Sequence, residues 1–145
     1  MTEIKITAAR PQDCDKVALL LKRSGLPIDD IDSCLEGFFT AFNEDNLVGT
    51  IGLEVYENIG LLRSLAVAPS HRGKGIGRQL HDRLLEAAQE KDLQYLYLLT
   101  TDADKYFARF GFKQITRDKT PDAIKKHEQF TRLCPDSAIV MEKIL

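Results

Sequence analysis

The sequence predicts an α/β fold in which helices flank a mixed central β-sheet, and three stretches support it. Residues 39–67 alternate apolar runs with turn signals, as antiparallel strands joined by short turns do. Residues 76–88 carry apolar side chains at helical spacing, and residues 93–100 (LQYLYLLT) are almost continuously apolar, as in a strand covered on both faces. A strand, a helix and a strand in this order indicate a parallel crossover, so the sheet is expected to be mixed.

The residues before this sheet predict a first strand over 4–7 and a helix over 11–25, which Pro11 opens and Gly25 closes. A second short helix is expected after Pro27, with Asp29 or Asp30 as its N-cap. Its apolar side would carry Ile31, Leu35 and Phe38.

The helix after residue 75 has a well-marked apolar face, made of Ile76, Leu80, Leu84, Ala87 and Ala88. Beyond the strand at 93–100, a helix is expected over 103–110 and ends at Gly111. Final strands are expected over 113–117 and 138–143, separated by a helix that Pro121 can start. We expect a single domain over 1–145, because a chain of this length can bury one core.

Bulk properties exclude several classes of function. A net charge of -2 and a pI near 5.9 give no general attraction to nucleic acid. No apolar run approaches the roughly 20 residues that cross a bilayer, so we expect a cytoplasmic protein with no membrane partner. Neither the cysteines nor the histidines show metal-ligand spacing, and we expect reduced thiols and no metal. These residues are Cys14, Cys34, Cys134, His71, His81 and His127.

The segment APSHRGKGIG joins the expected strand at 61–67 to the helix after residue 75. The first N–H groups of a helix lack intrahelical partners, and the helix dipole is positive there, so an anion is favoured. Glycines at 73, 75 and 77 permit close backbone approach. A P-loop needs Ser or Thr after its lysine, but Lys74 is followed by Gly75. A dinucleotide-binding fingerprint needs its last glycine where this chain has Arg78, so neither nucleotide-binding motif is present. The alternative is a basic surface turn that only ends a strand.

This stretch resembles the Q/R-x-x-G-x-G/A motif of the GCN5-related N-acetyltransferases, matched by Arg72, Gly75 and Gly77. The resemblance extends to LAVAPSHRG and to YFARFGF, in the same order along the chain. It implies acetyl-CoA as co-substrate, central parallel strands that splay at the loop, and a tendency to form homodimers. The pyrophosphate would be held by Arg72, Gly73, Lys74, Gly75, Ile76, Gly77 and Arg78, and the pantetheine arm by the backbone of Leu65, Ala66 and Val67.

Acetyl transfer to an amine needs a base, an oxyanion donor and often an acid for the departing thiolate. The resemblance assigns the donor to a backbone N–H of the strand at 61–67. The family commonly has a tyrosine as the general acid at the position where this chain has Phe107. Phe107 would then only line the cofactor site. The neighbouring Tyr106 points about 100° away on a helix and is either a shifted acid or a packing residue. Glu54 and Glu57 are candidate bases, and the alternative for each is a solvated carboxylate.

Three longer stretches look like the amino-acid acetyltransferases associated with arsenic resistance and, less closely, like N-acetylglutamate synthase. They are GLLRSLAVAP, LLTTDADKYFARFGF and AIKKHEQFTRLCPDSAIVM. The resemblance implies a glutamate-like acceptor or an analogue such as arsinothricin or phosphinothricin, whose carboxylates need cations. Arg63 is the first candidate, because it interrupts an apolar strand. The alternative is a strand-edge pair with Glu54.

Further candidates for the acceptor site are weaker. Ser64 is expected on the strand face opposite Arg63, so at most one of the two would line the same pocket. Arg132 and Lys125 are cations in a polar C-terminal segment. Two other functions stay open at this point, a protein or peptide acetyltransferase and a CoA-binding module that has lost catalysis.

Overall fold

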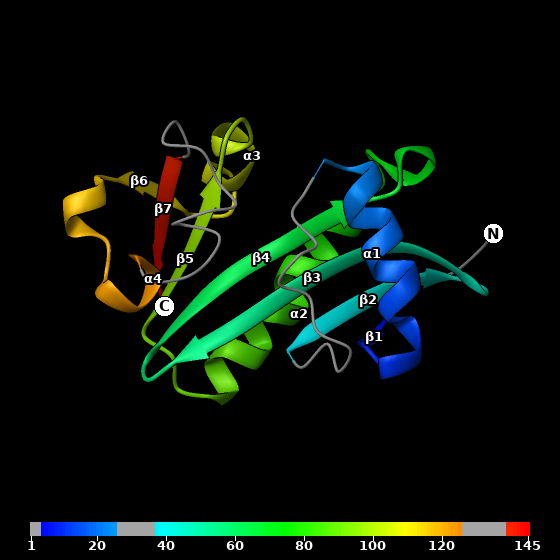
Figure 1. Cartoon of the computed structure of the whole chain (residues 1–145), viewed down its shortest axis with the longest axis horizontal. Helices are drawn as coiled ribbons and strands as arrows, with labels where there is room; N and C mark the ends of the chain where they lie inside the picture. The colour runs from blue at the N-terminus through cyan, green and yellow to red at the C-terminus, as the bar shows by residue number, and fades with distance from the viewer. Residues whose placement is uncertain (1–3, 26–36, 126–138) are drawn as a thin grey trace. The chain divides into compact units, whose positions relative to one another are not determined.

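The computed structural model describes residues 4–25, 37–125 and 139–145. The strands are β1 (Ile4–Ala8), β2 (Phe38–Asn43), β3 (Asn46–Tyr56), β4 (Ile59–Val67), β5 (Tyr95–Thr100), β6 (Lys113–Ile115) and β7 (Ile139–Ile144). They form a seven-stranded sheet in the order β1-β2-β3-β4-β5-β7-β6 (Figure 1). The predicted mixed sheet flanked by helices is confirmed.

Two compact units divide the chain. The first comprises Met1–Leu53 and Arg63–Glu90, and the second comprises Glu54–Leu62 and Lys91–Leu145. Strands β3 and β4 each contribute residues to both units.

Antiparallel pairing builds the sheet of the first unit. Strand β1 pairs with β2 from Ile4↔Asn43 to Ala8↔Phe39, and β2 pairs with β3 from Phe38↔Gly52 to Asn43↔Asn46. Phe38 was expected in a short helix, and this expectation is wrong. Its backbone joins the ladder with β3, and its side chain is buried in the core. The rest of that predicted helix, residues 29–36, lies outside the described residues.

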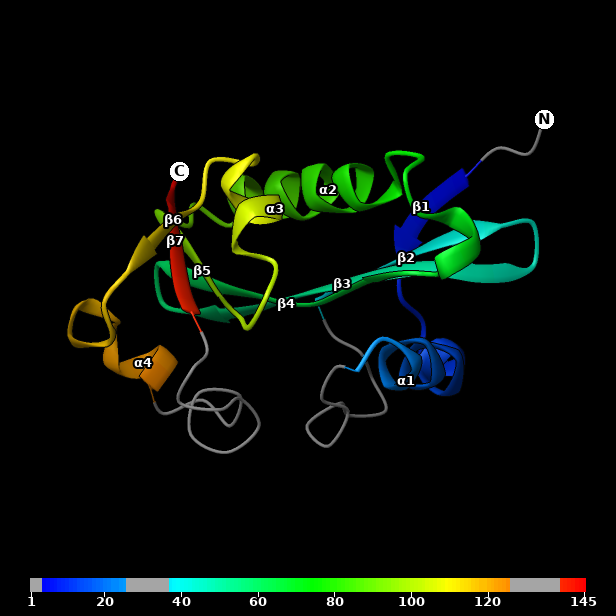
Figure 2. The ribbon, with the colours of Figure 1, turned by 90° about the horizontal axis from the view of Figure 1, so that it is seen from above.

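Two helices of the first unit lie on opposite faces of strands β1–β3 (Figure 2). Helix α1 (Cys14–Arg23) follows the 3-10 turn η1 (Pro11–Asp13), and helix α2 (Ile76–Glu90) follows the glycine loop. Helix α1 buries Val17, Leu20 and Leu21 in one core with Phe38 and Ala66.

The apolar face predicted for α2 is confirmed, because all its members are buried: Ile76, Leu80, Leu84, Ala87 and Ala88. Gly49 of β3 lets this helix approach the sheet. A Cβ at position 49 would lie 2.9 Å from Leu80 Cδ1 and 3.2 Å from Ile76 Cγ2. Close contact between α2 and β3 therefore depends on the absence of a side chain at position 49.

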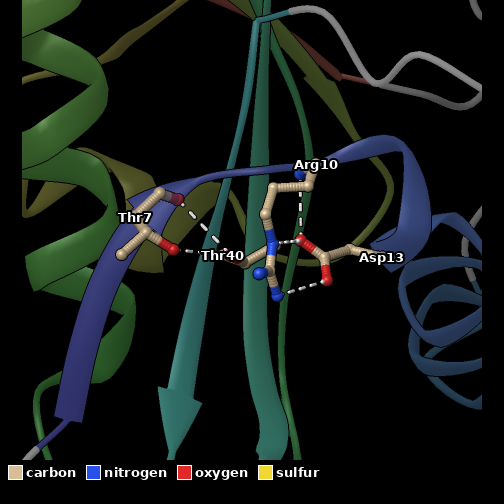
Figure 3. A network of polar contacts seen from close by, with 4 residues as sticks. All are labelled: Thr7, Arg10, Asp13 and Thr40. Carbon is tan, nitrogen blue, oxygen red and sulfur yellow. Dashed lines mark hydrogen bonds and ion pairs between the residues drawn. The ribbon is translucent and has the colours of Figure 1, made fainter.

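A buried carboxylate holds the turn from β1 into α1 (Figure 3). Asp13 is 2% exposed, and its Oδ2 accepts the backbone N–H of Arg10 at 2.9 Å while its Oδ1 accepts Nη2 of Arg10 at 3.3 Å. Burial raises the pKa of Asp13, but the hydrogen bonds and charge of Arg10 outweigh it and lower the pKa below its ordinary value. Beside this pair, the hydroxyls of Thr7 and Thr40 lie 3.3 Å apart across β1 and β2.

The second unit contains the parallel strand pair that the sequence predicts. Strand β4 pairs with β5 in parallel from Ile59↔Tyr95 to Leu61↔Tyr97, β5 pairs antiparallel with β7, and β7 with β6. Helices α3 (Asp104–Ala108) and α4 (Asp122–Lys125) lie on opposite sides of β5 (Figure 2). Both of these helices occur where expected, although α3 is shorter than the predicted 103–110.

The core of the second unit forms around Leu61, Tyr97 and Ile124. The phenol of Tyr97 donates to Glu142 Oε2 at 2.8 Å, which satisfies the one polar atom of a ring that is only 4% exposed. Burial, followed by the hydrogen bond to this carboxylate, raises the pKa of Tyr97 well above its ordinary value, so the phenol stays a donor.

Candidate functional site

Ser64 gives strand β4 an irregular backbone at its centre. Its φ is +59°, a left-handed value that non-glycine residues adopt rarely, and the residue is 8% exposed. The paired stretch of β4 with β5 ends at Leu61↔Tyr97, before this irregular residue, whereas β4 itself continues to Val67. A buried residue in such a conformation is held there by its surroundings, and this kind of local strain is common at functional sites.

Arg63 lies immediately before this irregularity and is 3% exposed. Its Nε donates a hydrogen bond to Ser64 Oγ at 3.1 Å, and its guanidinium carbon lies 5.9 Å from the centre of the Phe38 ring. The expectation that Arg63 and Ser64 point to opposite faces is therefore wrong. Strand alternation requires extended backbone at each residue, and the left-handed Ser64 interrupts it.

The glycine loop has the backbone that an anion site needs. Gly73 and Gly75 have φ values of +76° and +79°, and a Cβ on either would meet nothing within 4 Å. Helix α2 starts at Ile76, so its unpaired N–H groups and the positive end of its dipole lie at this loop. Lys74 and Arg78 are exposed here. The arrangement can bind a phosphate group through backbone amides.

Arg72 fixes the loop to the end of β4. Its Nε donates to the carbonyl oxygen of Val67 at 3.1 Å, and its backbone N–H donates to Pro69 at 3.4 Å within the 3-10 turn η2 (Pro69–His71). The side chain of Arg72 thus holds the strand end and the loop start together. The backbone of Leu65 to Val67 lies directly upstream of this contact.

The candidate catalytic carboxylates and the candidate acid belong to the second unit. Glu54 is half-buried and accepts a long hydrogen bond of 3.5 Å from the phenol of Tyr56, whereas Glu57 is exposed in the turn after β3 with a φ of +55°. Tyr106 packs edge-to-face on Phe107 and Phe110, with ring centres 5.3 and 5.0 Å apart. Burial raises the pKa of Tyr106, and the charge of Arg109 only partly offsets this.

Phe107 is buried, with 7% exposure, and packs on Phe112 at 5.9 Å between ring centres. Lys125 is the last residue of α4 and is half-buried, while Arg132 lies outside the described residues. The proximity of Phe38 to Arg63 leaves no signal in the sequence, because the two residues lie on separate strands and only the folded sheet brings them together.

The described residues contain neither a metal-binding cluster nor a membrane-spanning helix. No group of three or more His, Cys, Asp or Glu side chains that could hold a metal ion occurs in 4–25, 37–125 and 139–145. Within the same ranges, no helix is both long and apolar enough to span a bilayer.

Comparison with known proteins identifies the family. The model of the acetyltransferase (GNAT) family matches residues 9–112, which include β4, the glycine loop and α3. The chain belongs to the GNAT acetyltransferase family. The resemblance drawn from Arg72, Gly75 and Gly77 is thereby confirmed. This GNAT protein is an acetyl-CoA-dependent N-acetyltransferase.

Two relatives and one solved structure show what this GNAT protein is similar to. An amino-acid acetyltransferase of Mycobacterium tuberculosis is 28% identical over 85% of this chain and 82% of its own length. One of Neisseria meningitidis is 25% identical over 85% of this chain. The N-acetylglutamate synthase of Neisseria gonorrhoeae, solved with coenzyme A and N-acetyl-glutamate, has the same fold, with a TM-score of 0.85, 22% identity and 100% of this chain covered. This chain spans only 30% of the meningococcal relative and 36% of the gonococcal synthase.

Proposed function

We propose that this GNAT protein acetylates the amine of a small, glutamate-like amino acid in the cytoplasm. Toxic analogues such as arsinothricin and phosphinothricin belong to the same chemical class, because each presents an α-amine beside anionic groups. The observation that carries the proposal is Arg63, a cation that is 3% exposed on β4 and shares a hydrogen bond with the left-handed Ser64. Relatives named amino-acid acetyltransferase support the same class of acceptor.

The acceptor carboxylate is assigned to Arg63. A buried guanidinium favours an anionic partner, and its planar donor groups match the two oxygens of a carboxylate. Ser64 orients the guanidinium through its hydroxyl, at 3.1 Å from Nε. The carboxylate of an acidic amino acid can accept two parallel hydrogen bonds from this guanidinium, whereas a neutral side chain offers no charged acceptor of that shape. Arg132 stays a candidate for a second carboxylate.

Acetyl-CoA is assigned to the glycine loop. The pyrophosphate would accept hydrogen bonds from the backbone of residues 72–78, where Gly73 and Gly75 are exposed and have left-handed backbone. The pantetheine arm would pair with the backbone of Leu65, Ala66 and Val67, which continue β4 beyond its parallel ladder with β5. Phe107 would line the cofactor side of the site, in place of the tyrosine common in the family.

The reaction would proceed by direct attack in a ternary complex. The acceptor nitrogen forms a bond to the thioester carbonyl carbon, the C–S bond breaks, and CoA leaves as a thiolate. Glu54 or Glu57 would take the ammonium proton through a water molecule, and a backbone N–H of β4 would stabilise the oxyanion. The thiolate regains a proton from water or from Tyr106, whose raised pKa keeps its phenol protonated.

Turnover across a panel of acceptors tests this proposal. Release of CoA is measured with acetyl-CoA and glutamate, glutamine, lysine, arsinothricin, phosphinothricin and short peptides. We expect the anionic amino acids to give the highest kcat/KM, and glutamine to fall below glutamate because it lacks the side-chain carboxylate. Faster acetylation of peptides than of any free amino acid would overturn the proposal.

A further inference from the structure

A histidine next to the glycine loop has both ring nitrogens engaged. His71 is half-buried at the end of η2, and its Nε2 lies 2.9 Å from Nδ2 of Asn43. Its Nδ1 lies 2.8 Å from the hydroxyl of Ser70. The imidazole therefore bridges the end of strand β2 and the segment that leads into the loop.

Hydrogen-bond chemistry fixes the direction of these two contacts. An amide nitrogen only donates, so Nε2 of His71 accepts the proton of Asn43 and carries none of its own. The neutral ring then bears its proton on Nδ1, where it donates to Ser70 Oγ. The contact between Asn43 and His71 is therefore a directional hydrogen bond of normal length.

Both ends of the bond are placed by the backbone of the first unit. Asn43 ends β2 and pairs with Asn46 across the turn, so the ladder sets its position. At the other end, the backbone N–H of Ala68 donates to Val48 of β3 at 2.8 Å, and His71 follows shortly after. The β2–β3 turn and η2 lie at the same end of this unit (Figure 2). Asn43 thus ties the residue just before the loop to the sheet.

We infer that Asn43 and His71 are positioning residues for acetyl-CoA, acting on the loop that follows them. The inference rests on the proposed assignment of the glycine loop to the pyrophosphate. Glycine backbones lose more conformational entropy on ordering than those of other residues. Fixed ends therefore lower the entropy cost of binding for a loop that contains Gly73 and Gly75. Helix α2 fixes the downstream end through Ile76, which is 1% exposed. The Asn43–His71 bond and the Arg72–Val67 bond fix the upstream end.

A double-mutant cycle tests the inference. Binding of coenzyme A is titrated calorimetrically on Asn43→Leu, His71→Phe and the double variant, with melting temperatures measured alongside. Loss of one hydrogen bond predicts an about three- to tenfold weaker Kd in either single variant. The double variant should bind no more weakly than the weaker single variant, because both changes break the same contact. Either single variant alone suffices if the other does not fold.

Kinetics and a control separate positioning from general damage. KM for acetyl-CoA should rise as Kd does, while kcat with the best acceptor stays within about twofold, because neither side chain touches the reacting atoms. Asn46→Leu changes the exposed residue opposite Asn43 and should leave Kd unchanged. Folded single variants with wild-type affinity, or a double variant whose loss is the product of the two single losses, would overturn the inference. If Gly75→Val also binds coenzyme A normally, the loop assignment itself has failed.

Discussion

Replacing Arg63 by alanine should weaken the acceptor far more than acetyl-CoA. Arg63 is 3% exposed, so its interaction with a carboxylate is little screened by water. A hydrogen bond to a charged group contributes about 1.5–3 kcal/mol, which corresponds to a roughly ten- to hundredfold loss in kcat/KM for the acceptor. We expect KM for acetyl-CoA to change by less than about threefold, because the loop lies outside the contacts of Arg63. Steady-state kinetics with both substrates varied give the two values.

The structure also predicts a cost in stability, which the assay has to separate from the loss of function. Arg63→Ala removes the bond from Nε to Ser64 Oγ and leaves that buried hydroxyl without it, at a cost of about 1–3 kcal/mol. The matched variant Ser64→Ala removes the same bond but keeps the cation. It should lower the melting temperature comparably and weaken the acceptor by less than Arg63→Ala. Arg63→Lys should restore only part of the activity, because an ammonium lacks the planar fork.

Two outcomes would contradict the assignment of Arg63 to the acceptor. If Arg63 serves only as a structural partner of another residue, such as Glu54, then Arg63→Ala lowers the melting temperature and leaves the kinetics of every acceptor unchanged. A folded Arg63→Ala variant that keeps the preference for glutamate over glutamine would remove the basis for an acidic acceptor at this position.

Three further predictions concern the loop, the candidate acid and the buried carboxylate. Gly75→Val should raise KM for acetyl-CoA more than about tenfold. The control is Gly25→Val, because Gly25 has a similar φ of +72° and open surroundings, so this variant should carry the same backbone strain of about 1–2 kcal/mol without affecting KM. Equal effects of the two variants on KM would contradict the loop assignment. Tyr106→Phe should keep kcat within about tenfold, and a loss of about a hundredfold would make the phenol a general acid. Asp13→Asn should destabilise the fold by about 1 kcal/mol at neutral pH in urea unfolding. Because the pKa of Asp13 is lowered in the folded protein, its stabilisation is present above the ordinary carboxyl pKa of 3.8 and is lost as pH falls through the lower folded value. A difference from wild type that persists at pH values below that folded pKa would contradict the contribution of Arg10.

Regular elements could be predicted from the sequence because their side-chain periods are simple. The apolar face of α2 follows a helical period without interruption, and all five of its predicted members are buried. The turns expected within residues 39–67 occur at 44–45, between β2 and β3, and at 57–58, between β3 and β4. The spacing of Phe38 from the apolar residues before it fits a helix, but a single apolar residue also fits the first position of a strand. Only its pairing with Gly52 in the β2–β3 ladder decides between helix and strand.

The details of the site depend on contacts that a local pattern does not contain. Serine has no marked preference for left-handed backbone, so the φ of Ser64 and its bond to Arg63 arise from the packing around β4. The Asn43–His71 contact joins residues 28 apart and requires the register of β2 with β3. The glycine loop was predictable because its chemistry lies in consecutive residues, whereas the residues around Arg63 come from separate strands.

A competition experiment tests the central claim most directly. Limiting acetyl-CoA is offered to the wild-type protein together with equal concentrations of glutamate, glutamine and a lysine-containing peptide, and the acetylated products are quantified by mass spectrometry. If Arg63 binds an acceptor carboxylate, most of the acetyl group will be found on the α-amine of glutamate. Acetyl groups found mainly on the peptide, or spread evenly over glutamate and glutamine, would contradict it.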